Sequence, residues 1–145
     1  MQIGVDTSRA VENKRVFVVD DDEVTRAVLQ FMLQDENETH DLASLTSAYA
    51  KGEQGRPDLL LLGLSVIEAA QAGLFERIGV LWPRTRIVVV SDPCRVSAAR
   101  ALLRSGAHGV LSKPFTVAAV RRAADLQLGR IKPPLIQLQL APSSA

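Results

Sequence analysis

Short, nearly unbroken apolar runs, separated by longer amphipathic segments, constrain this chain most strongly. Five runs are expected to be β-strands, at residues 15–20, 39–44, 58–62, 86–91 and 109–112. Three of them (RVFVVD, DLLLL and RIVVVS) do not alternate between apolar and polar residues, which is typical of strands buried on both faces. Strands of this kind that alternate with helices predict an α/β fold, in which helices cover both faces of a parallel sheet.

The segments between the strands carry apolar residues at helical spacing, which predicts five helices. Asp22 and Thr46 stand where N-caps are expected, and Pro83 is expected to end the third helix. The residues that mark these helices are, in chain order, Val24, Ala27, Val28 and Phe31; the turn from Thr46 to Gly52 or Gly55; Ala70, Leu74, Ile78 and Leu81; Val96, Ala99, Leu102 and Leu103, up to Gly106; and Val117, Val120, Ala124 and Leu128, up to Gly129.

This alternation favours the doubly wound, flavodoxin-like arrangement, a five-stranded parallel sheet with strand order 2-1-3-4-5. Ligands of such sheets bind beyond the carboxyl ends of the strands, near the point where the strand order reverses. The residues expected at that edge are Asp20, Asp21, Gly63, Ser91 and Lys113.

The chain has 145 residues, enough for one domain with short tails. We expect an N-terminal extension at 1–13, the domain at 14–130 and a C-terminal tail at 131–145. In the tail, Pro133 and Pro134 break any helix, and Ile136, Leu138 and Leu140 alternate with polar residues. The pattern leaves an added edge strand, a partner-binding segment and a disordered tail open.

Charge and cysteine content favour a protein of a reducing compartment with two opposed surfaces. Residues 1–92 hold nine Lys/Arg and fifteen Asp/Glu, whereas residues 93–145 hold eight and one. The single cysteine excludes a disulfide framework. Neither a signal peptide nor an apolar run of about 20 residues is present, so we expect a cytoplasmic protein without membrane contact.

Four segments, in this order, carry a family resemblance: VVDDDEVTR, RPDLLLLGLSV, SDP at 91–93 and GAHGVLSKPF. Together they resemble a bacterial response-regulator receiver domain of the CheY-like superfamily, over about residues 14–130. The resemblance implies two-component phosphorelay signal transduction. In that chemistry an aspartate accepts a phosphoryl group, Mg²⁺ neutralises its oxygens, and a lysine and a hydroxyl group bind the product.

The resemblance assigns a role to each residue of the expected edge. Asp20 and Asp21 take the place of the metal carboxylates, Ser91 that of the hydroxyl and Lys113 that of the cation, with a cis bond before Pro114. The phosphoacceptor position falls on Gly63.

Two further positions depart from the family pattern. Val110 stands at the aromatic switch position, and Ile67 replaces a proline that is usual in the family.

These departures remove parts that phosphoryl switching needs. Gly63 has no side chain to phosphorylate, and the loss of one carboxylate should leave Mg²⁺ binding weak or absent. Lys113 loses its counter-ion and is expected to pair with Asp20 or Asp21. Val110 has no polar tip that could swing between buried and exposed positions. The sequence therefore predicts a stand-alone pseudo-receiver that requires no cofactor, is no enzyme and acts by protein binding.

The basic residues of the last two helices suggest where a partner binds. They are Arg95, Arg100, Arg104, Arg121 and Arg122, on either side of the strand at 109–112. A sensor kinase, a downstream signalling protein or a second copy of the chain are all candidates, and nucleic acid is not expected. Two other functions stay open: a small-anion or nucleotide sensor, and a receiver phosphorylated at an unexpected acceptor such as Ser65.

Overall fold

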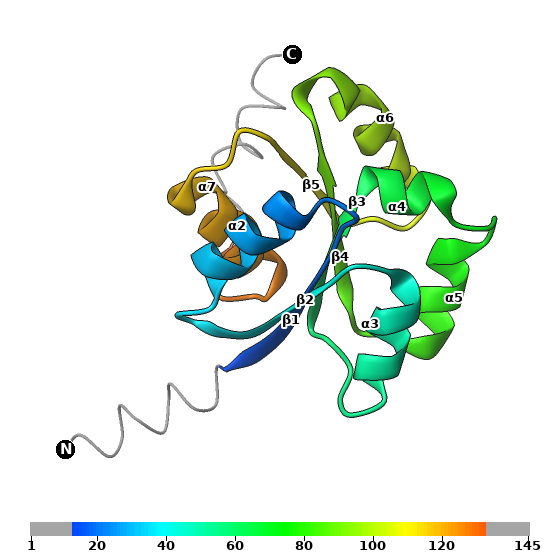
Figure 1. Ribbon diagram of the computed structural model, residues 1–145, viewed down its shortest axis with the longest axis horizontal. Coiled ribbons are helices and arrows are strands. Elements are labelled where there is room, and N and C mark those ends of the chain that lie inside the picture. Colours follow the sequence, from blue (N-terminus) through cyan, green and yellow to red (C-terminus); the bar gives the residue numbers. More distant parts are fainter. Residues whose placement is uncertain (1–12, 133–145) are drawn as a thin grey trace, which may run out of the picture.

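The computed structural model describes residues 13–132, which form a five-stranded, all-parallel sheet (Figure 1). The strands lie in the order β2-β1-β3-β4-β5, which confirms the flavodoxin-like fold. Their bounds are Lys14–Val19 (β1), Asn37–Leu42 (β2), Leu59–Gly63 (β3), Arg86–Ser91 (β4) and Gly109–Ser112 (β5). The three unbroken apolar runs are β1, β3 and β4, the central strands, whose apolar residues are almost all fully buried.

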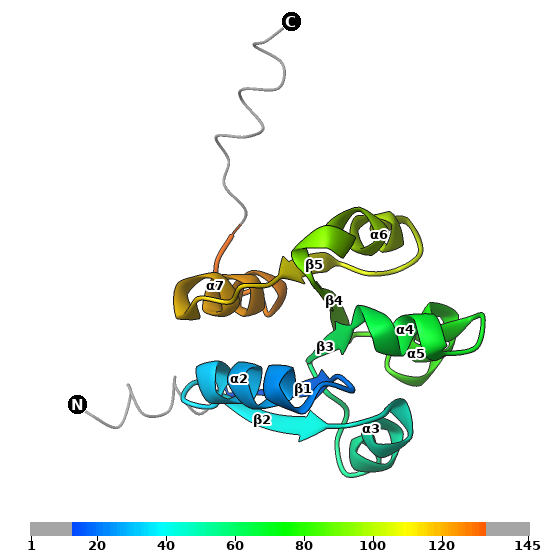
Figure 2. The same ribbon diagram turned by 45° about the horizontal axis from the view of Figure 1, so that its top comes forward.

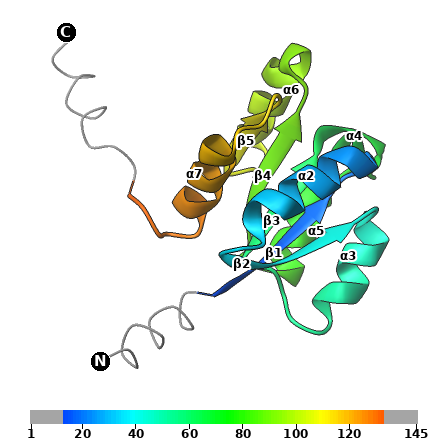
Figure 3. The ribbon, with the colours of Figure 1, turned by 60° about the vertical axis from the view of Figure 1, so that its left-hand side comes forward.

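Helices cover the sheet in two layers (Figures 2 and 3). On one face α2 packs through Leu29 and Leu33, and α7 through Val120 and Ala124. The central strands contribute alternate residues to this face, namely Val16, Val18, Leu59, Leu61, Val88 and Val90. On the other face lie α3, α5 and α6, through Ala48, Ile78 and Ala99. The helix bounds are Glu23–Leu33 (α2), Leu45–Gly52 (α3), Leu64–Ala69 (α4), Leu74–Leu81 (α5), Val96–Ala101 (α6) and Val117–Gln127 (α7), with 3₁₀ turns at Pro93–Arg95 (η1) and Leu102–Arg104 (η2).

Helix α2 turns a different face to the core than its apolar spacing indicates. Its buried residues are Thr25, Leu29 and Leu33, whereas Val24 and Phe31 are 68% and 71% exposed. The stripe that predicted the helix therefore faces solvent.

Local turn chemistry explains the other differences from the expected elements. Ser44, not Thr46, caps α3, because its Oγ accepts the Ser47 N–H at 3.2 Å. One expected helix is two, α4 and α5, separated at Gly73, whose φ of 88° is left-handed and favours glycine.

The two expectations for the termini concern residues that lie almost wholly outside the part of the chain that the structure describes. The extension at 1–13 and the tail at 131–145 fall mostly on residues 1–12 and 133–145. Between residues 13 and 132 no helix is both long and apolar enough to cross a membrane.

Candidate functional site

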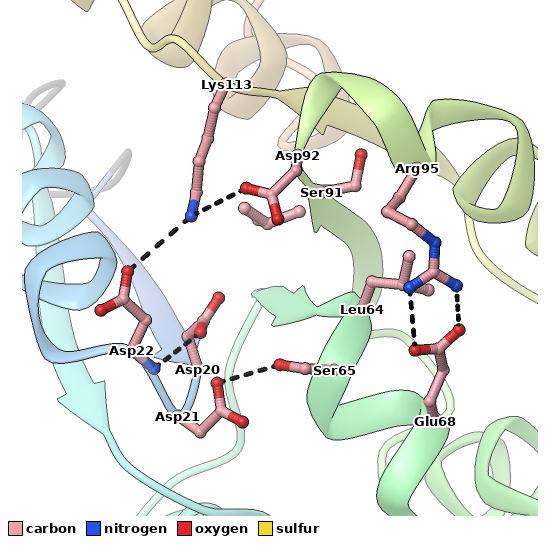
Figure 4. A pocket seen from close by; sticks show the side chains of 11 residues that line it. Asp20, Asp21, Asp22, Leu64, Ser65, Glu68, Ser91, Asp92, Arg95 and Lys113 are labelled. Atoms are coloured by element: carbon pink, nitrogen blue, oxygen red, sulfur yellow. Dashed lines mark hydrogen bonds and ion pairs between the residues drawn. The ribbon is translucent and has the colours of Figure 1, made fainter.

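A cavity of about 260 Å³ opens at the carboxyl edge of the sheet, between β1, β3 and β4 (Figure 4). The chain reverses its strand order here, so loops from several strands meet at one place. The lining residues are Asp20, Asp21, Asp22, Leu64, Ser65, Glu68, Val90, Ser91, Asp92, Arg95 and Lys113. Four of the five residues expected at this edge line the cavity, and the fifth, Gly63, ends β3 beside Asp20.

Asp20 fills the space that a side chain at position 63 would need. A Cβ added to Gly63 would lie 2.7 Å from the Asp20 Cγ, and closer still to Oδ2. The backbone of Gly63 is ordinary extended chain, with φ −63° and ψ 140°, so its conformation does not require glycine. Only the position of the Asp20 carboxyl group excludes a larger residue.

The Asp20 carboxyl group is buried, and one of its two oxygens accepts a backbone hydrogen bond. Its Oδ1 accepts the Asp22 N–H at 2.9 Å, and the residue is 7% exposed. Burial raises the pKa of Asp20 above its ordinary value, and the neighbouring Asp21 raises it further, against the opposing effects of the Asp22 N–H and Lys113. This carboxyl group therefore favours its neutral form more than an exposed aspartate does.

Asp21 lies at the mouth of the cavity and contacts α4. The Ser65 hydroxyl donates to the Asp21 Oδ1 at 2.9 Å. Ser65, the candidate for an unexpected phosphoacceptor, therefore lies at the site, and its hydroxyl group is hydrogen-bonded to a carboxylate.

Lys113 pairs with two carboxylates that the sequence had not assigned to it. Its Nζ lies 3.3 Å from Asp92 Oδ1 and 3.8 Å from Asp22 Oδ2. The predicted pairing with Asp20 or Asp21 is wrong, because Asp20 is turned into the space beside Gly63 and Asp21 faces Ser65.

Asp22, which was expected to cap α2, occupies the N-cap position without making a side-chain bond to the helix backbone. Its Oδ2 accepts instead from the Thr25 hydroxyl at 2.6 Å. This bond is the main reason that the pKa of Asp22 is lowered, and the nearby backbone N–H groups of Val24 and Thr25 and, last, Lys113 lower it further. The run of acids at residues 20–22 indicates that one of these acids pairs with Lys113, but the sequence does not tell which one.

Ser91 is buried at the end of β4, and its Oγ has no hydrogen-bond partner among residues 13–132. Figure 4 shows its hydroxyl group pointing away from Asp20 and Asp21. Val110, at the switch position, lies in the neighbouring strand β5, beside the buried Val89 and Ala99. The peptide bond between Lys113 and Pro114 is cis, as the resemblance implies.

The basic residues expected on one partner face separate into two groups. Arg95 lines the cavity and binds both carboxylate oxygens of Glu68, one of them at 3.3 Å. Arg121 binds α2, through the Met32 carbonyl at 3.2 Å and Asp35 at 3.3 Å. The remaining three, Arg100, Arg104 and Arg122, are exposed.

The carboxylates do not fit the Mg²⁺ site that the resemblance implies. In the part of the chain that the structure describes, no group of three or more His, Cys, Asp or Glu side chains is arranged to hold a metal ion. One Asp20 oxygen accepts a backbone N–H and the other lies beside Gly63, while one Asp21 oxygen accepts from Ser65. A divalent ion would have to displace these contacts.

Solved structures share the fold. The receiver domain of NtrX from Brucella abortus has a TM-score of 0.71 and 26% identity, covering 80% of this chain and 99% of that one. A putative response regulator from Chloroflexus aurantiacus has a TM-score of 0.71 and 22% identity, covering 81% and 99%. A longer NtrX chain from Brucella abortus, in complex with ADP, has a TM-score of 0.74 and 23% identity; it covers 90% of this chain, which spans only a third (33%) of it.

A family comparison covers most of the described residues. No curated protein sequence matches the chain. The model of the response regulator receiver domain matches residues 16–125, the span that contains β1 to β5 and every residue of the cavity. The chain therefore belongs to the response regulator receiver domain family.

Proposed function

We propose that this chain is a pseudo-receiver of bacterial two-component signalling, which binds another protein and accepts no phosphoryl group at position 63. The observation that carries the proposal is the pair of Gly63 and Asp20. The acceptor position has no side chain, and a neighbouring carboxyl group occupies the vacated space.

The rest of the cavity supports the same function. A phosphoryl group needs an attacking oxygen, a metal ion and a free cation. Here the cation Lys113 already has two carboxylate partners, and Arg95 has a third in Glu68. The cavity therefore neutralises its own cations without a ligand, and we expect neither a required cofactor nor an enzymatic turnover.

The surface of α6, β5 and α7 is the proposed binding site. Strand β5 is an edge strand of the sheet, and its neighbours carry the exposed Arg100, Arg104 and Arg122. Within residues 13–132 no carboxylate pairs with these three arginines and no strand pairs with the outer edge of β5. Such a surface suits an acidic partner, such as a sensor kinase or a downstream signalling protein, or a second copy of the chain. We place this interaction in the cytoplasm.

Treatment with a phosphodonor tests the first half of the proposal. The protein is incubated with acetyl phosphate or beryllofluoride and Mg²⁺, then examined by intact mass and by amide NMR. We expect no mass increase of a phosphoryl group and no change at residues 20, 63 and 113. A phosphorylated protein would overturn the proposal, and a Ser65→Ala variant would show whether Ser65 had accepted the group.

Charge reversal tests the second half. Arg100→Glu combined with Arg104→Glu is expected to abolish capture of the partner that co-purifies with the wild-type chain, since the proposed surface then repels an acidic protein. Arg84→Glu is the matched control, because Arg84 is an exposed arginine in the turn before β4, outside α6, β5 and α7. Equal losses in both variants would place the partner elsewhere.

The alternative, an anion or nucleotide sensor, is less well supported by the charges. Structures of NtrX from Brucella abortus were solved with ADP and with ATP, but this chain spans only about a third of those proteins. The cavity here is lined by five carboxylates and two cations, which disfavours a free anion. Thermal stabilisation by phosphate or a nucleotide, without a metal ion, would favour the sensor instead.

A further inference from the structure

Helix α2 carries an apolar stripe that nothing in the described part of the chain covers. Val24 and Phe31 are seven residues apart on one helix face and are 68% and 71% exposed, with Ala27 and the partly buried Val28 between them. We define these four residues as the α2 stripe. A stripe two turns long is more than scattered surface residues, and contiguous exposed apolar surface of this kind is typical of interaction sites.

The C-terminal tail begins beside this stripe. Arg130 donates to the Glu36 carbonyl at 3.2 Å, which holds the chain after α7 against the end of α2. Arg121 of α7 reaches Met32 and Asp35 in the same region. Figures 1 and 3 show the end of α7 near the C-terminal end of α2.

The composition of residues 133–145 suits the stripe. The segment PPLIQLQLAPSSA carries no charged side chain, so laying it on α2 buries no charge. Ile136, Leu138 and Leu140 alternate with Gln137 and Gln139, so an extended chain places the three apolar residues on one side.

The dimensions also agree. Thirteen extended residues span about 43 Å, whereas a helix of eleven residues is only about 16 Å long. Ile136 to Leu140 covers about 13 Å in an extended chain, close to the ~10 Å from Phe31 to Val24 along the helix axis. Starting at Glu36, the tail would run antiparallel to α2 and set Ile136 near Phe31 and Leu140 near Val24.

We propose that the segment 135–140 docks on the α2 stripe and forms an intramolecular cover, which a partner of α2 must displace. The inference does not depend on the function proposed above. It concerns the face of the sheet that α2 and α7 cover, away from Gly63.

A spin label on the tail tests the docking in the full chain. Cys94, the only cysteine, is changed to Ser, and a nitroxide is attached through Ser143→Cys, beyond the apolar segment. We expect the amide signals of Val24 and Phe31 to broaden, while those of Val80 keep their intensity. Val80 is the matched reference because it is 85% exposed on α5, on the opposite face of the sheet.

Two variants show whether the apolar contacts cause the broadening. Phe31→Ser and the pair Leu138→Ser with Leu140→Ser are each expected to abolish it, and Val80→Ser is expected to leave it unchanged. Phe31 is exposed, so its change does not disturb the core. Broadening that persists in these variants, or that is equal at Val80, would overturn the proposal.

A mixed sample separates the intramolecular cover from a dimer. Spin-labelled chains without ¹⁵N are added to ¹⁵N-labelled chains without the spin label. No broadening is expected, because each tail docks on its own helix. Broadening of Val24 and Phe31 in this sample would mean that a second copy covers the stripe, and the proposal would be wrong.

Discussion

Replacing Gly63 with alanine tests whether the Asp20 carboxyl group occupies the space beside Gly63. The new methyl group would stand 2.7 Å from the Asp20 Cγ, so the carboxyl group must rotate away. The rotation breaks its hydrogen bond to the Asp22 N–H at 2.9 Å. Overpacking of a buried site costs about 1–3 kcal/mol, and the lost hydrogen bond accounts for about 1 kcal/mol of this.

Two other effects of the alanine on the free energy of unfolding are smaller. Alanine allows the unfolded chain fewer conformations than glycine does, which stabilises the variant by about 0.4–1 kcal/mol. Gly63 also precedes α4 as its N-cap, where alanine is less favourable than glycine. We therefore expect Gly63→Ala to lower the free energy of unfolding by about 1–2 kcal/mol in total, from these combined magnitudes.

A double-mutant cycle isolates the contribution of Asp20. Asp20→Ala removes the atoms that collide with the new methyl group, while the backbone effects of Gly63→Ala stay the same. The destabilisation should therefore shrink by about 1–2 kcal/mol in the Asp20→Ala background. Urea denaturation measures this, with the fluorescence of Trp82 as probe, because it is the only tryptophan and is 4% exposed.

Gly79→Ala is the matched control for the cycle. Gly79 lies within α5, and a Cβ there meets nothing within 4 Å. Its replacement is expected to stabilise the protein by up to about 1 kcal/mol, through helix propensity. If Gly63→Ala behaved like Gly79→Ala, or if its coupling to Asp20→Ala stayed below about 0.5 kcal/mol, the reasoning about the Asp20 carboxyl group would be refuted.

Three further predictions follow from the same contacts. Gly63→Asp is expected to lower the melting temperature more than Gly63→Ala does, because it adds a like charge beside Asp20, and Mg²⁺ should restore that loss by binding the three carboxylates; equal stabilisation of the wild type by Mg²⁺ would contradict this. Asp20→Asn should raise the free energy of unfolding at pH 7 by about 1 kcal/mol, because the buried group is then neutral. The pKa of Asp20 is raised in the folded state, so the wild type gains stability as the pH falls through that pKa, and the two chains should converge below the unfolded value of 3.8 in urea denaturation at several pH values. The pKa of His108 is instead lowered by burial and by Arg86, and its neutral Nδ1 accepts the Ile87 N–H at 2.9 Å. Stability should therefore fall as the pH drops from 6.5 through the folded pKa of His108, and His108→Asn, which cannot titrate, should lose this dependence in thermal melts.

The sheet could be predicted from the sequence because its central strands are buried on both faces. Leu59 to Leu62 must all be apolar, whichever face of the sheet each side chain points to. The strand can therefore be recognised in the sequence even when its register is not known. The orientation of α2 could not be predicted in this way. Its most apolar stripe faces solvent, and the core instead takes Thr25, whose hydroxyl group is satisfied by Asp22.

For the site, too, the sequence predicts which residues meet but not how their side chains are oriented. Which residues meet at the carboxyl edge follows from the order of the strands, and Asp20, Asp21, Ser91 and Lys113 do line one cavity. Which carboxylate pairs with the lysine depends on side-chain rotation, which spacing along the chain does not encode. Gly63 lets Asp20 turn inward, and this rotation leaves Asp22 and Asp92 as the partners of Lys113.

The inward rotation of Asp20 links the missing acceptor to the state of the whole cavity. A charged carboxylate beside Gly63 is poorly solvated, and burial accordingly raises the pKa of Asp20 above its ordinary value. Three of the remaining acids pair with the two cations, with Lys113 between Asp22 and Asp92, and Arg95 on Glu68. Both cations of the cavity that could bind a phosphoryl group therefore already have carboxylate partners. Under the function proposed above, the signal of this receiver should therefore follow the concentration of the protein and of its partner, not the activity of a kinase.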